Sequence, residues 1–110
     1  MVMVRAIVRP EKAEEVMAAL MAEGFPAITR INVSGRGKQR GIKIGDVIYG
    51  EISKELLLMV IKSEDKNFVV RKIIETARTG GGSFGDGKIF VSPVEEVYTV
   101  SSGIREAPDT

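Results

Sequence analysis

The chain has 110 residues, a net charge of +1 and 44% hydrophobic residues, which fit one small domain. It contains neither Cys nor His, which excludes a disulfide framework, thiolate catalysis and the commonest general base and metal ligand. The near-neutral charge argues against a nucleic-acid partner. No apolar run approaches the roughly 20 residues of a membrane span, so we expect a cytoplasmic protein without direct membrane insertion.

The first third of the chain predicts a strand, a helix and a second strand. Residues 2–8 are mostly apolar in both alternating sets, which is typical of a well-buried strand. Pro10 suits the first turn of a helix, and Gly24 and Pro26 suit its end. Residues 28–33 are rich in β-branched side chains and predict the next strand. One apolar helix face is spelled out at helical spacing by Ala13, Val16, Met17 and Leu20.

The rest of the chain predicts a long loop, a strand, a helix and a final strand. Residues 42–53 show no sustained period, so we expect a mobile loop over about 37–53. The apolar run 56–61 predicts a third strand, and Ser63 or Asp65 is a candidate cap for a helix that ends before the glycines at 80–82. Residues 88–92 predict a fourth strand, 97–100 a short edge strand, and 101–110 a tail.

The order β-α-β-β-α-β predicts an α+β fold, the ferredoxin-like sandwich with helices on one face of an antiparallel sheet. We expect one domain over residues 1–110. The strands show little polar alternation, so the helix-free face also needs a cover. Other subunits provide that cover most simply.

A glycine-rich basic segment follows the second predicted strand. Glycine lets backbone N–H groups approach an anion closely, and flanking cations add charge. A solvated hairpin loop is the alternative, since the segment matches neither the Walker A pattern nor G-x-G-x-x-G. The segment consists of Gly35, Arg36, Gly37, Lys38, Gln39, Arg40 and Gly41.

A second glycine-rich segment joins the second helix to the fourth strand. Residues 79–88 contain five glycines, which is costly in chain entropy and is usually retained for backbone shape. Gly85, Asp86 and Gly87 followed by Lys88 would place amides and an ammonium group around a phosphate. A plain Asp-Gly turn is the alternative.

Residues 42–53 mix apolar and charged side chains, which suggests docking onto a partner. A β-ribbon packed on its own subunit is the alternative. No nucleophile–base pair can be assembled without His or Cys, so we do not expect an enzyme.

Three stretches of the sequence resemble the PII nitrogen-regulatory family in order and spacing. They are residues 6–12 (AIVRPEK), the segment 35–41, and residues 79–91 with their GDGKIFV run. Residues 92–103 resemble more specifically the PII-like proteins encoded beside nitrogenase genes in archaea and anaerobic bacteria, the first of two paralogues.

The resemblance implies a homotrimer, or a hetero-oligomer with the paralogue, that holds ATP or ADP between subunits and senses 2-oxoglutarate with Mg²⁺ and ATP. The implied nucleotide residues are Ile7, Thr29, Gly35, Gly37, Lys38, Gly85, Asp86, Gly87 and Lys88. Gln39 would ligate Mg²⁺ and, with Lys54, contact 2-oxoglutarate. The implied partner-binding residues are Arg40, Lys43, Asp46, Tyr49 and Glu51.

The implied target is a nitrogenase component, and an ammonium transporter is the alternative. The sequence departs from the family pattern where two arginines usually stand in the last strand, because Thr99 and Ser101 occupy those positions. Arg78, Arg105 or the paralogue would have to compensate.

Overall fold

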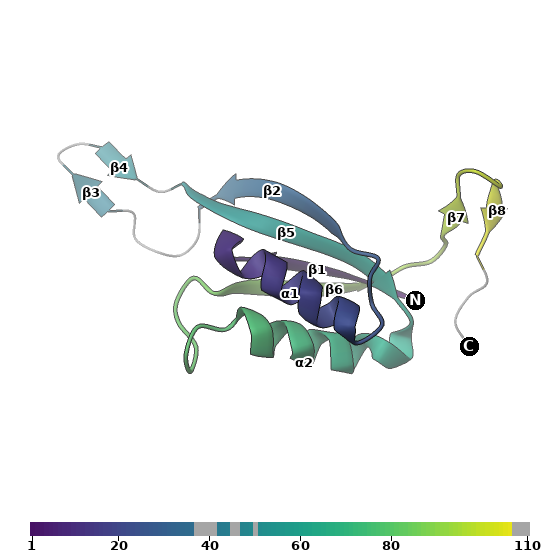
Figure 1. The fold of residues 1–110 in the computed structure, drawn as a ribbon. Helices are drawn as coiled ribbons and strands as arrows, with labels where there is room; N and C mark the ends of the chain where they lie inside the picture. Colours follow the sequence, from purple (N-terminus) through teal and green to yellow (C-terminus); the bar gives the residue numbers. More distant parts are fainter. Residues whose placement is uncertain (37–41, 45–46, 50, 107–110) are drawn as a thin grey trace.

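The computed structural model describes residues 1–36, 42–44, 47–49 and 51–106. Its centre is a four-stranded antiparallel sheet in the order β2-β5-β1-β6, with both helices on one face (Figure 1). This arrangement confirms the ferredoxin-like α+β prediction. The elements are β1 (Val2–Val8), α1 (Pro10–Ala22), β2 (Thr29–Gly35), β3 (Ile42–Ile44), β4 (Val47–Tyr49), β5 (Ile52–Ile61), a 3-10 turn η1 (Ser63–Asp65), α2 (Lys66–Ala77), β6 (Gly87–Pro93), β7 (Tyr98–Thr99) and β8 (Ile104–Arg105).

The hydrophobic core lies between the two helices and the two central strands. Successive strand residues point to opposite faces of a sheet, so alternate residues of β1 and β5 face the helices. The apolar faces of α1 and α2 repeat at helical spacing and meet them there. The buried core consists of Val4, Ala6, Val8, Ala13, Val16, Leu20, Leu57, Met59, Ile61, Val69, Ile73 and Ala77.

The other face of the sheet is also largely apolar. Ile7 and Leu56 are half-buried there, whereas Ile31 is 43% and Phe90 48% exposed. None of the described helices lies on this face (Figure 1). The apolar character agrees with the expectation from the sequence, and its cover by other subunits stays a prediction.

Residues 42–53 differ from the predicted loop. β3 and β4 form a short antiparallel hairpin, and β5 begins at Ile52, four residues before the predicted strand. The described residues of this segment are thus extended and not irregular, and the mobility predicted for residues 37–53 stays a prediction. The segment is rich in β-branched residues, which favour extended backbone, and Ile52 to Glu55 pair with β2 although the sequence there lacks a continuous apolar run.

The C-terminal segment also differs from the prediction. β7 pairs with β8 in a separate hairpin instead of adding an edge strand to the main sheet. β6 ends at Pro93. The next residue lies beside the N-terminus, since the N–H of Val94 donates to the carbonyl of Met1 at 3.1 Å. The second predicted helix is present as α2 and ends before the glycines at 80–82, but the side chain of the candidate cap Asp65 makes no capping hydrogen bond.

Candidate functional site

An open groove of about 950 Å³ lies on the helix-free face of the sheet. It forms where β2 ends and where β5 and β6 begin. The antiparallel register brings these three places together, since Gly35 pairs with Ile52 and Val8 pairs with both Glu55 and Gly87. The lining residues are Ile7, Val33, Ser34, Gly35, Arg36, Ile52, Lys54, Leu56, Ser83, Phe84, Gly85, Asp86, Gly87, Lys88 and Phe90.

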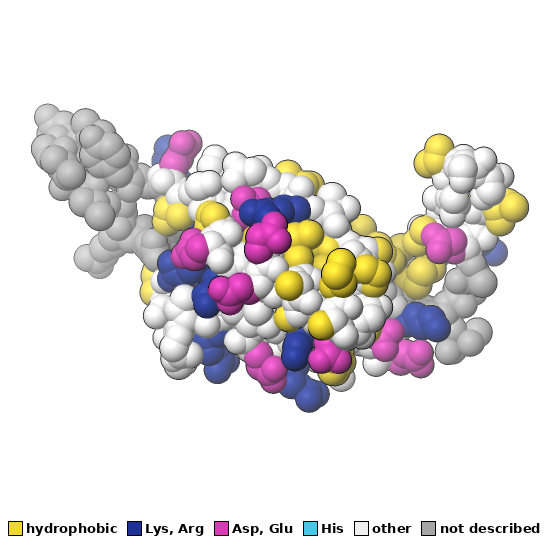
Figure 2. All heavy atoms as spheres, viewed as in Figure 1, with side chains coloured by type: hydrophobic (Ala, Val, Ile, Leu, Met, Phe, Trp, Pro, Cys, Tyr) yellow, Lys and Arg dark blue, Asp and Glu magenta, His cyan; other side chains and the backbone are white. Residues whose placement is uncertain are grey.

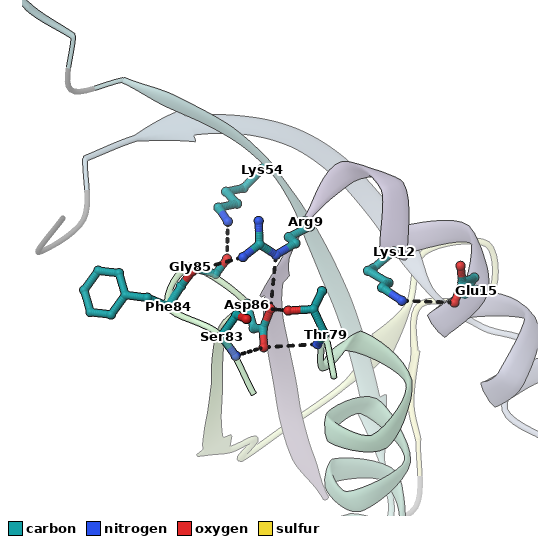
Figure 3. Close-up of polar contacts among 9 residues, drawn as sticks. All are labelled: Arg9, Lys12, Glu15, Lys54, Thr79, Ser83, Phe84, Gly85 and Asp86. Atoms are coloured by element: carbon teal, nitrogen blue, oxygen red, sulfur yellow. Dashed lines mark hydrogen bonds and ion pairs between the residues drawn. The ribbon is translucent and has the colours of Figure 1, made fainter. Parts of the chain in front are cut away.

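One wall of the groove is the glycine-rich segment, and Asp86 holds its shape. Oδ2 of Asp86 accepts hydrogen bonds from the backbone N–H of Ser83 at 2.8 Å and of Thr79 at 3.2 Å. Oδ1 accepts from the hydroxyl of Thr79 at 2.7 Å and from Nε of Arg9 at 3.1 Å. Four donors therefore surround one carboxylate, which closes residues 79–86 into a defined turn (Figure 3).

These donors stabilise the charged form of the Asp86 carboxylate. The hydrogen bond from the Ser83 amide, then those from Thr79 and Arg9, hold the pKa of Asp86 far below its ordinary value of 3.8. Asp86 is thus ionised at neutral pH, and its negative charge is engaged within the protein.

Two cationic side chains donate hydrogen bonds to consecutive backbone carbonyl groups of this segment. Nη2 of Arg9 donates to the carbonyl of Phe84 at 3.0 Å, and Nζ of Lys54 donates to the carbonyl of Gly85 (Figure 3). Burial, and secondly the Arg9 guanidinium, lower the pKa of Lys54, while Glu11 and Asp86 act in the opposite direction. The charged form of Lys54, which lines the groove, is therefore less favoured than that of a lysine in water.

The lining combines cations with apolar surface. Arg36, Lys54 and Lys88 contribute positive charge, and Asp86 is the one acid among the described lining residues. Because Arg9 pairs with Asp86, the groove as a whole favours an anion. Phe84 and Phe90 contribute aromatic surface that suits a flat apolar group.

The structure brings together most of the predicted nucleotide residues that it describes. They are Ile7, Gly35, Gly85, Asp86, Gly87 and Lys88, and Lys54, which is predicted to contact 2-oxoglutarate, lines the same groove. Thr29 does not join them, because it begins β2 opposite Leu58 and lies outside the groove lining. Asp86 is in the lining, but its carboxylate binds the turn itself, a role that the sequence interpretation did not give it.

Several predicted residues cannot be placed in this way. Gly37, Lys38, Gln39, Arg40 and Asp46 lie outside the described residues. Lys43 belongs to β3 and Tyr49 to β4, and Glu51 is exposed just before β5.

The sequence interpretation missed two contributors to the site. Arg9 has no role among the predicted site residues, although its side chain reaches the turn at 84–86. Phe84 carries no motif, and nothing in the sequence indicates that it lines the groove. The two cations named as compensating candidates do not line it either, since Arg105 lies in the hairpin beyond the far end of β6 and Arg78 follows α2.

Two further properties bear on the kind of site. Among the described residues, no group of three carboxylates lies close enough to hold a metal ion. Neither α1 nor α2, the helices that the structure describes, is long and apolar enough to cross a membrane.

The fold and groove define a class: a ferredoxin-like domain with a cation-lined groove between a glycine-rich turn and the start of β5. The family model "Nitrogen regulatory protein P-II" matches residues 1–104. The chain belongs to this PII family of nitrogen regulators.

Particular relatives narrow the placement. The chain is 54% identical to "Nitrogen fixation nifHD region glnB-like protein 1" of Methanococcus maripaludis, over 91% of this chain and 93% of the relative. It is 36% identical to the "protein 2" counterpart of that species, over 91% and 92%. The crystal structure of Arabidopsis thaliana PII bound to citrate superposes with a TM-score of 0.78 at 36% identity, covering 96% of this chain and 87% of the other. The nitrogen-fixation subgroup inferred from residues 92–103 is thereby confirmed.

Proposed function

We propose that this chain regulates nitrogen fixation by binding ATP or ADP in the groove and signalling its occupancy to a nitrogenase component. The observation that carries the proposal is the convergence of Arg36, Lys54 and Lys88 on one groove whose only described acid is already paired. Arg36 and Lys88 suit a polyphosphate, Lys54 suits a further anion beside it, and the neighbouring aromatic surface suits a base. The chain acts by binding, without turnover of the nucleotide.

Mg²⁺ would accompany ATP rather than bind the described residues alone. The Asp86 carboxylate is saturated by four donors, so phosphate oxygens and Gln39 are the ligands we assign to the ion. When bound, the ion neutralises phosphate charge. That neutralisation would limit the repulsion that a second anion meets in the same groove.

The second anion is 2-oxoglutarate, bound by Lys54 and Gln39. Lys54 carries a charge that burial and Arg9 disfavour, so a carboxylate beside it would be stabilising. The Arabidopsis relative was crystallised with citrate, which is also a small polycarboxylate. A carboxylate ligand therefore suits the positive charge of Lys54, and it is chemically similar to the citrate bound by the Arabidopsis relative.

Assembly into a trimer, or into a hetero-oligomer with a second PII-like chain, would complete the site. The helix-free face is apolar beside the groove, and Ile31 and Phe90 are exposed on it. Thr99 lies beyond the far end of β6 from Gly87, so the C-terminal residues of one chain would reach only a neighbour's groove. A chain with Thr99 and Ser101 would then supply fewer cations to that neighbour.

The partner is assigned from the relatives' names and from the hairpin. The relatives are described as proteins of a nitrogen-fixation region. The hairpin of β3 and β4 projects from the groove end of the sheet, away from the helices (Figure 1). We assign docking to Lys43 and Tyr49 of the hairpin and to the nearby residues Arg40, Asp46 and Glu51 of the same stretch of sequence, so that ligand in the groove alters the direction of the hairpin.

Calorimetry tests the ligand assignment. ADP, ATP with Mg²⁺, and 2-oxoglutarate are titrated singly and together, with 2-oxoglutarate expected to bind only beside ATP and Mg²⁺. Lys88→Gln should weaken nucleotide binding at least about tenfold, since a hydrogen bond to a charged group is lost. Lys62→Gln is the matched control because Lys62 is exposed beyond the opposite end of β5. Absence of nucleotide binding by the wild-type chain would overturn the proposal.

Co-purification tests the partner assignment. Nitrogenase components should be retained by the tagged wild-type chain with its paralogue, and released when 2-oxoglutarate, ATP and Mg²⁺ are added together. Retention that ignores all three ligands would argue against ligand-controlled docking.

A further inference from the structure

Arg9 lies just after β1, and its side chain donates hydrogen bonds to two acceptors of the glycine-rich turn, the carboxylate of Asp86 and the carbonyl of Phe84. Its Nε reaches Oδ1 of Asp86 at 3.1 Å and its Nη2 reaches the carbonyl of Phe84 at 3.0 Å. Asp86 is 77 positions and Phe84 is 75 positions from Arg9 in the sequence. Figure 3 shows the guanidinium lying between the turn and the start of α1.

The backbone that carries Arg9 is held rigidly. Val8 before it is 2% exposed and is paired with β5 and β6. Pro10 after it begins α1, and the N–H of Lys12 donates to the carbonyl of Arg9 at 3.0 Å. Arg9 therefore offers a fixed point from which a flexible turn can be held.

The turn needs such a point because its own backbone is permissive. Gly80, Gly82 and Gly85 all have positive φ values, of 57°, 111° and 93°. A chain so rich in glycine loses much conformational entropy when it becomes ordered. If the turn were flexible before the ligand bound, the entropy lost on ordering it would weaken binding.

We propose that Arg9 is a positioning residue that sets the affinity of the groove for a phosphate-bearing ligand by ordering residues 79–86 in advance. It acts through Asp86 and the Phe84 carbonyl, and it is absent from the groove lining itself. The side chain of Asp86 transmits the effect, because the same carboxylate also binds Thr79 and Ser83. This inference rests on the proposed nucleotide function.

The test uses ADP as the probe and calorimetry on the full chain. Arg9→Gln should weaken the affinity of the chain for ADP about tenfold. Arg71→Gln, on the exposed surface of α2, should bind as the wild type does. Arg9→Lys should recover only part of the loss, because a lysine cannot present two N–H groups in the fixed fork of an arginine.

A double-mutant cycle separates positioning from direct contact. If Arg9 acts through the turn, Arg9→Gln combined with Asp86→Asn should lose little more than either alone, whereas Arg9→Gln combined with Lys88→Gln should lose nearly the sum. Additive losses for the first pair would assign Arg9 to direct ligand contact and overturn the inference.

Amide hydrogen exchange supplies a readout that does not depend on the ligand. The N–H groups of Thr79 and Ser83 should exchange faster in Arg9→Gln, while those of the central strand β1 stay protected. If the wild-type chain binds ADP and the Arg9→Gln variant binds it with equal affinity, this inference alone is overturned. Wild-type chain that does not bind ADP would overturn the proposed function and this inference with it. Should Arg9→Gln fail to fold, Thr79→Val removes one donor from the same carboxylate, and unchanged ADP affinity there would count against the inference.

Discussion

A β-carbon placed on Gly87 would lie 1.8 Å from the carbonyl oxygen of Ile7 and 2.9 Å from its carbonyl carbon. Both atoms belong to the backbone of the central strand β1, so neither can move aside cheaply. Gly87 also has a φ of 121°, which L side chains rarely adopt. The glycine is therefore needed to bring the turn at 79–86 against β1, where Arg9 can reach it.

Gly87→Ala should destabilise the fold by about 2–5 kcal/mol, the sum of backbone strain and overpacking. Urea denaturation at one fixed protein concentration measures the change. Gly81→Ala is the matched control: its φ is not positive and nothing lies within 4 Å of the added carbon. Equal stability of the two variants would show that the contact between the two backbones is relieved by a small shift.

The pKa of Asp86 predicts a specific acid response. Because the folded-state pKa lies below the ordinary 3.8, the contribution of this group is fully present above 3.8 and is lost as the pH falls through the folded-state pKa. The turn should therefore stay ordered at pH values below 3.8 at which exposed carboxylates are already protonating. Asp86→Asn should lose this component of the acid dependence, and its Thr79 and Ser83 amides should exchange faster at neutral pH. An unaltered acid profile and unaltered exchange in Asp86→Asn would contradict the assignment.

Lys54 predicts a second response of stability to pH, of the same sign but in the alkaline range. Burial and Arg9 lower its folded-state pKa below the ordinary 10.5, so the folded state gives up the proton before the unfolded chain does. Stability should rise with pH between the folded-state pKa and 10.5, because the unfolded chain binds more protons there. Lys54→Met should flatten that rise in denaturation experiments from neutral pH to 10.5, and Lys62→Met should not. The same rise in Lys54→Met would exclude Lys54 as its source.

A partly buried ion pair on the helix-bearing face of the sheet, opposite the groove, predicts a coupling between β2 and β5. The Glu55 carboxylate is 10% exposed, lies 3.5 Å from Nη2 of Arg30, and accepts a hydrogen bond from Asn32 at 3.2 Å. Arg30→Gln should cost about 1–3 kcal/mol, since it leaves a buried charge with fewer donors. The cost should shrink when Glu55→Gln is already present, as a double-mutant cycle in urea would measure. Independent, additive costs would show that the pair contributes no mutual stabilisation.

Sequence patterns predicted most of the fold because the core elements are strongly periodic. The helix over Pro10–Ala22 and the strand Val2–Val8 are marked by an apolar face, a proline and a glycine, all of which act locally. The predictions missed the extended backbone at Ile52–Glu55 and at Ile104–Arg105, and they assigned the strand near Tyr98–Thr99 to the main sheet instead of to a hairpin with β8. There the extended backbone depends on pairing with a strand that is remote in sequence or on a short hairpin, and local patterning carries little of that information.

The sequence by itself determined the chemistry available to this protein. Without Cys or His, and with two glycine-rich segments bearing lysines and arginines, it favours anion binding over catalysis. Only the tertiary structure decided that Arg9 and Lys54 grip neighbouring carbonyls of one turn and that Asp86 binds the turn instead of facing a ligand. The physical reason is the register of the sheet, which brings residues 9, 54 and 86 to one end through hydrogen bonds between strands that no local pattern records.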